Sequence, residues 1–72
     1  MKEIELRTVP VELFKILKFE GLAHSGGEAK SFIEGGHVLV NGRVETQKRK
    51  KIVSGDEITF QNETYKITSV VS

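Results

Sequence analysis

Apolar and charged residues alternate at the start of the chain, over residues 3–7, which places Ile4 and Leu6 on the same face. A period of two is typical of a strand with one buried face. The period changes after Pro10, and proline favours the first position of a helix. We therefore expect a short strand, then a helix that begins near Pro10 and ends at Gly21. The apolar face of this helix consists of Leu13, Phe14, Ile16 and Leu17.

A second helix is expected directly after the first, because the linker of residues 22–24 is short. Ser25 can accept a hydrogen bond from the backbone at the helix start, while Glu28 can reach back to the capping residue. Gly35-Gly36 then stop the helix. The two helices should form a helix-turn-helix-like pair that needs a sheet to cover its apolar side. The apolar positions of the second helix share one face: Ala29, Phe32 and Ile33.

The rest of the chain has the pattern of strands. Residues 38–40 are apolar and lead into Asn41-Gly42, a dipeptide that suits a tight hairpin because both of its residues tolerate positive φ. Further strands are expected at residues 43–45, 52–53, 57–60 and 64–71. The last of these could pair with the strand at 57–60 or with the N-terminal strand. The predicted fold is α+β, with two short helices packed on a small, mainly antiparallel sheet, in a single domain over residues 1–72.

The length of 72 residues limits what this domain can contain. A chain of this size forms one compact core and leaves little room for a deep catalytic cleft. It has no cysteine, which excludes disulfides and thiolate metal sites and fits a reducing compartment. Neither a signal peptide nor an apolar run of about 20 residues is visible. We expect a soluble, cytoplasmic protein without a membrane partner.

Charge is distributed unevenly, although the net charge is only +1. Residues 1–23 sum to 0, residues 24–53 to +3 and residues 54–72 to −2. A basic patch on a nearly neutral body is typical of a module that contacts phosphates, whereas the simplest alternative is a solvated lysine loop. Arg43, just after the hairpin turn, is a further candidate contact, and so is His37, although a lone histidine at a strand start is more often structural. The basic run consists of Lys48, Arg49, Lys50 and Lys51.

The start of the second helix is another candidate phosphate site. Free N–H groups and the positive end of the helix dipole lie there, and Gly26 and Gly27 would let a phosphate approach beside Ser25. Lys30 follows about one turn later, on the flank of the apolar stripe. Simpler interpretations are an ordinary cap for Ser25 and turn flexibility for the glycines.

The order of these features resembles a known family. Residues 13–60 are similar to the RNA-binding domain named after ribosomal small-subunit protein S4, whose helix-helix-hairpin core is called the alpha-L motif. The short chain and the segments SGGEAK and ETQKRKK resemble the small stand-alone bacterial members of the YbcJ type. Family members often have an arginine soon after the helix-start serine, where this chain has Gly26-Gly27 and the acidic Glu28, which implies weaker phosphate affinity on the helix side. The matching positions are Ser25, Ala29-Lys30, Ile33, Gly36, Val38, Val40-Asn41-Gly42, Lys51-Ile52, Gly55-Asp56 and Ile58.

This resemblance implies RNA binding without catalysis. The expected partner is structured RNA, ribosomal or transfer RNA, free or on a ribosomal subunit, which a monomer would recognise through phosphate geometry and shape. Lys15 and Lys18 are expected to be solvated. The main alternative is a protein-interaction adaptor whose basic loop docks on an acidic partner. The predicted RNA contacts are Ser25, Gly26, Gly27, Lys30, His37, Arg43, Lys48, Arg49, Lys50 and Lys51.

Other chemistry finds little support in the residues. His24 and His37 alone cannot supply the three or four ligands of a zinc site. Glycine-rich nucleotide-binding motifs and isolated carboxylate pairs are not found. A sulfur-carrier-like protein would need a C-terminal Gly-Gly, whereas this chain ends in residues Val70-Val71-Ser72. We expect no enzyme activity, no metal, no cofactor and no small-molecule substrate.

The aromatic residues are expected in the core, so stacking of unpaired bases on an exposed ring is not the predicted mode of recognition. These residues are Phe14, Phe19, Phe32, Phe60 and Tyr65.

Overall fold

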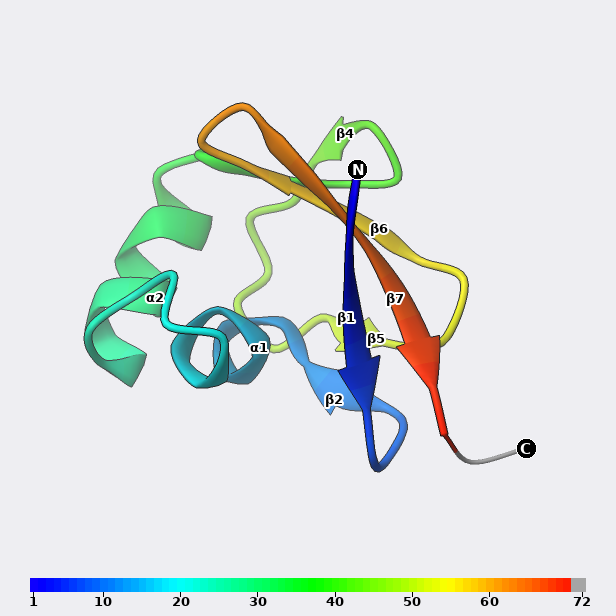
Figure 1. Cartoon of the computed structure of the whole chain (residues 1–72). Helices are drawn as coiled ribbons and strands as arrows, with labels where there is room; N and C mark the ends of the chain where they lie inside the picture. Colours follow the sequence, from blue (N-terminus) through cyan, green and yellow to red (C-terminus); the bar gives the residue numbers. More distant parts are fainter. Residues whose placement is uncertain (71–72) are drawn as a thin grey trace.

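The structure, a computed structural model, describes residues 1–70 and contains two helices and seven strands in that range (Figure 1). The predicted α+β fold, two helices with a mainly antiparallel sheet, is confirmed. The helices are α1 (Leu13–Phe19) and α2 (Gly26–Glu34). The strands are β1 (Lys2–Leu6), β2 (Val11–Glu12), β3 (Val38–Val40), β4 (Arg43–Val44), β5 (Lys51–Ile52), β6 (Glu57–Phe60) and β7 (Glu63–Ser69).

Five of the strands form one sheet in the order β1-β7-β6-β3-β4. β1 lies parallel to β7, with Ile4 opposite Ile67, and the other neighbours in this sheet are antiparallel. β7 therefore pairs with both strands that the sequence offered as its partners. It ends at Ser69, and Val71, which the sequence placed in the same strand, lies outside the described residues.

The start of the first helix differs from the prediction. Pro10 is not its first residue, because the next two residues form β2 and α1 begins only at Leu13. β2 pairs antiparallel with β5, with Val11 opposite Ile52, in a separate two-stranded sheet. Proline locally favours a helix start, but the pairing of β2 with β5, a strand far along the chain, outweighs this preference. A local sequence pattern does not reveal such a distant partner. Val53, expected to continue the strand of Ile52, lies beyond β5 and is exposed.

Buried side chains from both helices and both sheets form one hydrophobic cluster, and α1 and α2 lie side by side next to the larger sheet (Figure 1). The predicted apolar faces of the two helices lie in it, apart from Phe32, which is partly buried against it. Among the described residues no polar or charged residue is buried, so the charged groups lie at the surface. The cluster consists of Ile4, Leu6, Leu13, Phe14, Ile16, Leu17, Ala23, Ala29, Ile33, Val38, Val40, Ile52, Ile58, Phe60 and Ile67.

Phe19 is outside this core, contrary to the expectation for it. Its exposed fraction is 69%. At 3.6 residues per turn, the last residue of α1 falls on nearly the opposite side of the helix from the buried positions. The prediction failed because it weighed the residue type rather than its place on the helix.

The β3–β4 turn is fastened to the turn that precedes β6. Asn41 has a φ of 54°, as its place in a tight turn requires, and its side chain donates to Asp56 Oδ1 (3.1 Å) and accepts from the Glu57 N–H (3.0 Å). Asp56 also accepts from the Val53 N–H through its other carboxylate oxygen (3.0 Å). These side chains hold two neighbouring turns together, so their role in this structure is architectural.

We expect N41A to lower the free energy of unfolding by about 1 to 2 kcal/mol, because it removes two side-chain hydrogen bonds and places alanine at positive φ. N41G tolerates the positive φ but also lacks the hydrogen bonds, so it should lie between N41A and the wild type. Urea denaturation of the three proteins measures this order. Equal stability of N41A and the wild type would show that the coupling of the turns contributes nothing.

Candidate nucleic-acid interface

The backbone of the basic run is attached to the start of α1. Helix N-termini leave N–H groups without partners inside the helix, and the N-cap residue of α1, Glu12, makes no side-chain capping bond. Instead, the N–H of Leu13 donates to the carbonyl oxygen of Lys50 (2.9 Å) and that of Phe14 donates to the carbonyl oxygen of Lys48 (3.1 Å). The segment is therefore held in place by its carbonyls, which leaves its cationic side chains free to point outward.

Three cations surround the ring of Phe14. The Lys30 ammonium lies 4.6 Å, the Arg49 guanidinium 5.7 Å and the Lys15 ammonium 6.0 Å from the ring centroid. Each lies within the range over which a cation is attracted to an aromatic face. Gly26, the first residue of α2, also lies near this ring, since a Cβ added there would be 3.7 Å from it. α1, α2 and the basic run thus meet at Phe14; we call the four residues Phe14, Lys15, Lys30 and Arg49 the Phe14 cluster.

The start of α2 is capped largely as the sequence predicts. Ser25 Oγ accepts from the Glu28 N–H (3.1 Å). The Glu28 carboxylate accepts from the N–H of His24 (2.8 Å), one residue before the cap rather than the cap itself. Ser25 and Gly27 are exposed, so the N-terminal end of α2 is open to solvent beside the Phe14 cluster. The negative charge of Glu28 interacts favourably with the positive end of the α2 helix dipole. The same charge reduces the attraction of the α2 start for anions.

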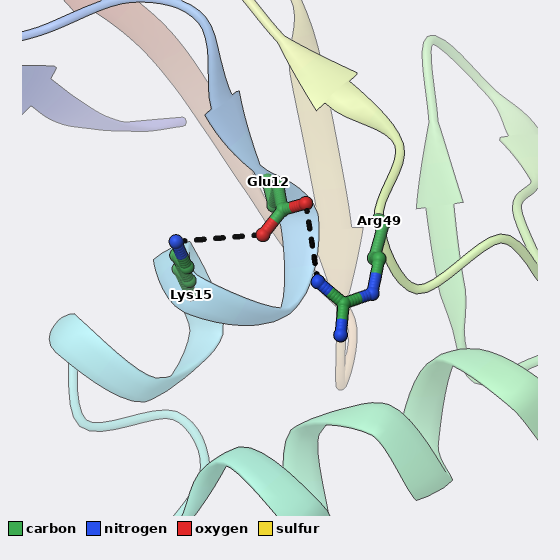
Figure 2. A network of polar contacts seen from close by, with 3 residues as sticks. All are labelled: Glu12, Lys15 and Arg49. Carbon is green, nitrogen blue, oxygen red and sulfur yellow. Dashed lines mark ion pairs between the residues drawn. The ribbon is translucent and has the colours of Figure 1, made fainter.

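Glu12 joins two of the cations to each other (Figure 2). One carboxylate oxygen lies 3.4 Å from Lys15 Nζ and the other 3.5 Å from Arg49 Nη1. The Glu12 side chain is only 15% exposed. Sequence reasoning missed this residue as part of the site; the available signal was its i,i+3 spacing to Lys15.

The pKa of the Glu12 carboxyl lies below its ordinary value of 4.5. Desolvation is the largest single influence and raises the pKa, but the hydrogen bond from Lys15 and the positive charges of Lys15, Arg49 and Lys51 together outweigh it. Glu12 is therefore ionised in the neutral range and offsets part of the positive charge of the site.

The remaining predicted residues divide into two groups. Lys48 forms an ion pair with Glu34 at the end of α2 (3.2 Å), and Lys50 and Lys51 are exposed. Of the other two candidates, His37 packs edge-on against Phe32, and Arg43 is on β4. Figure 1 places β4 at one end of the molecule and β2 with β5 at the other.

The contacts with α1 and with the Phe14 ring therefore bring the start of α2 and the basic run together. The predicted residues at this interface are Ser25, Gly26, Gly27, Lys30, Lys48, Arg49, Lys50 and Lys51. Within residues 1–70, no group of three or more His, Asp or Glu side chains is arranged to hold a metal ion. In the same range, neither helix has the length and apolar character needed to cross a membrane.

Glu12 should make stability depend on pH in acid. Its folded-state pKa is below the unfolded value, so its contribution is present above about pH 4.5 and is lost as the pH falls through the folded-state pKa. In E12Q this part of the pH dependence should be absent. Denaturant unfolding between neutral pH and pH 3, with an NMR titration of the Glu12 carboxyl, measures both effects; parallel stability curves for the two proteins would contradict the assignment.

Comparisons with known proteins identify the family of this chain. The sequence profile of the S4 domain matches residues 4–68. The chain is 44% identical over 59 residues to YbcJ of Escherichia coli (strain K12), across 82% of this chain and 84% of that protein, and the same values hold for YbcJ of Shigella flexneri.

A solved structure shows the same fold. The solution structure of YbcJ from E. coli, described as revealing an alpha-L motif involved in RNA-binding, superimposes with a TM-score of 0.70 at 42% identity and covers 94% of this chain and 87% of that one. The matched segment contains both helices, the hairpin and the basic run. The chain therefore belongs to the S4 domain family.

Proposed function

We propose that this protein is an RNA-binding module, not an enzyme, which recognises structured RNA such as ribosomal or transfer RNA through phosphate charge and backbone shape. The observation that carries this proposal is the Phe14 cluster, where three cations from α1, α2 and the basic run surround one ring beside an open helix start. The similarity to YbcJ, described as having a motif involved in RNA-binding, supports it.

The arrangement favours phosphates held at fixed spacing over a flexible polyanion. The backbone of the basic run is fixed to α1, so less conformational freedom is lost when its side chains bind. Free N–H groups at the start of α2 offer a second place for a phosphate oxygen near Lys30. A-form RNA presents phosphates and 2′-hydroxyls rather than readable base edges in its deep groove, so recognition here would depend on shape.

The ion pairs of Arg49 and Lys48 do not prevent this binding. Arg49 and Lys48 are well exposed, at 63% and 41% of their side chains. Exposed pairs contribute only about 0 to 1 kcal/mol, so an RNA phosphate can replace a carboxylate at little cost. We also propose that the protein acts as a monomer in the cytoplasm, and ribosomal subunits are the first RNA particles to test.

Replacing the basic run by K48Q/R49Q/K50Q/K51Q should weaken binding to structured RNA broadly and flatten its salt dependence. Each lost phosphate contact should reduce the log–log salt slope by about 0.7 to 0.9. The control K2Q/R7Q/K18Q/K66Q removes the same number of charges elsewhere and should keep most of the wild-type slope. Binding to ribosomal RNA fragments, duplex DNA and unstructured RNA across a salt series measures both.

Two results would contradict the proposal. If both variants lose affinity equally, net charge rather than this surface governs binding. If the wild-type protein binds no nucleic acid above background, the proposal is wrong and docking of the basic run on an acidic protein partner becomes the leading function.

Substitutions of Ser25 can distinguish its role as a helix cap from its predicted contact with a phosphate. S25D should keep the stability of the protein because aspartate caps helices as well as serine, but its charge should weaken RNA binding. S25A should instead lose about 1 kcal/mol of stability. Thermal unfolding and RNA titration of both variants test this, and wild-type affinity in S25D would remove the α2 start from the interface.

A further inference from the structure

Phe19 is the exposed phenylalanine of this chain, and two adjoining hollows border its ring. The larger has a volume of about 420 Å³ and the smaller about 290 Å³. Both are lined by Thr8 and Val11 as well as by Phe19. An aromatic ring that is 69% exposed at the edge of a hollow is a surface on which a flat ligand can stack.

The charges around the two hollows differ. The larger is bordered by Lys15 and Lys51 and by the carboxylate of Glu12. The smaller has one cation, Arg7, and two carboxylates, those of Glu5 and Glu20. The larger hollow therefore has excess positive charge beside an exposed ring, and the smaller has excess negative charge. An anionic, aromatic ligand fits the larger hollow.

This hollow is continuous with the interface described above. Lys15 borders it and also belongs to the Phe14 cluster, where its ammonium lies 6.0 Å from the Phe14 ring. Lys51 is the last residue of the basic run and lies opposite Glu12 in the β2–β5 pair. A ligand that covers the Phe14 cluster would therefore reach the rim of the hollow without leaving the basic surface.

We propose that the larger hollow holds one unpaired nucleotide of the RNA, with its base against the Phe19 ring and its phosphate near Lys15 and Lys51. The inference rests on the proposed function, and it adds that the preferred RNA has a bulged or otherwise unpaired nucleotide beside a helix. Pro10 and Val11 supply apolar lining. The volume lies in the range of small-ligand sites, which suits a single nucleotide.

The site selects unpaired nucleotides without selecting a particular base. Every base has a flat face, so stacking on an aromatic side chain tolerates all four. A base within an intact duplex is stacked on its neighbours and cannot reach Phe19. Discrimination should therefore follow the presence of the unpaired nucleotide rather than its identity.

The test uses two RNA duplexes of the same sequence, one perfect and one with a single-nucleotide bulge, titrated with the full chain. The wild-type protein should bind the bulged RNA about tenfold more tightly, within the range measured for one base stacked on an aromatic ring. F19L keeps an apolar side chain without the ring and should lose this preference while its affinity for the perfect duplex is unchanged. F19Y keeps the ring and should keep the preference, as should V44T, which changes an exposed apolar residue on β4.

A direct observation complements the variants. Stacking of a base should move the Phe19 ring proton resonances of the wild-type protein upfield with the bulged RNA and not with the perfect duplex. If the protein binds both RNAs but shows neither a bulge preference nor the shift, or if F19L keeps the preference, the hollow is not a nucleotide site and the proposed function still stands. If neither RNA binds, the proposed function fails and this inference fails with it.

Discussion

The site depends on two backbone hydrogen bonds, those from the N–H groups of Leu13 and Phe14 to the carbonyl oxygens of Lys50 and Lys48. A helix start would normally recruit a side-chain cap or water, and here it recruits the main chain of a cationic segment. The same bonds fix where Arg49 stands relative to Phe14. A four-cation run would otherwise repel itself and lie extended in solvent, so the helix start converts a charged loop into part of a surface.

The charged groups of the site combine a reduced net positive charge with cations that are held at fixed positions. Glu12 reduces the net positive charge, yet it holds Lys15 and Arg49 at defined positions, and the Phe14 ring attracts Lys30. Exposed ion pairs contribute little to stability. Their effect here is on the geometry of the cations, because side chains that are already ordered lose less freedom when a ligand binds.

Much of the fold followed from local patterns. The cap at Ser25, the turn at Asn41 and the apolar faces of both helices are short-range features, and the structure agrees with each. What the sequence did not predict depends on distant partners. β2 forms because β5 is available, and Glu12, whose side chain is largely buried, meets Arg49 from a segment far along the chain.

The candidate site shows the same division. Arg43 lies on β4 and His37 packs against Phe32, and neither place could be read from their nearness in sequence to the basic run. Phe19 is different, because its helical position alone placed it outside the core. Its ring is exposed at the same hollow that Lys15 and Lys51 border.

The pairing of β1 with β7 has a consequence for how the chain is made. β1 is an edge strand whose neighbour in the sheet is the last strand to be synthesised, while the two helices, the hairpin and the basic run lie between them. On the ribosome, Ile4 and Leu6 must stay unpaired until β7 emerges, whereas the central segment can already begin to assemble. The pairing of β1 with β7 is therefore a long-range contact, and such contacts form more slowly than the local contacts within the helices and the hairpin.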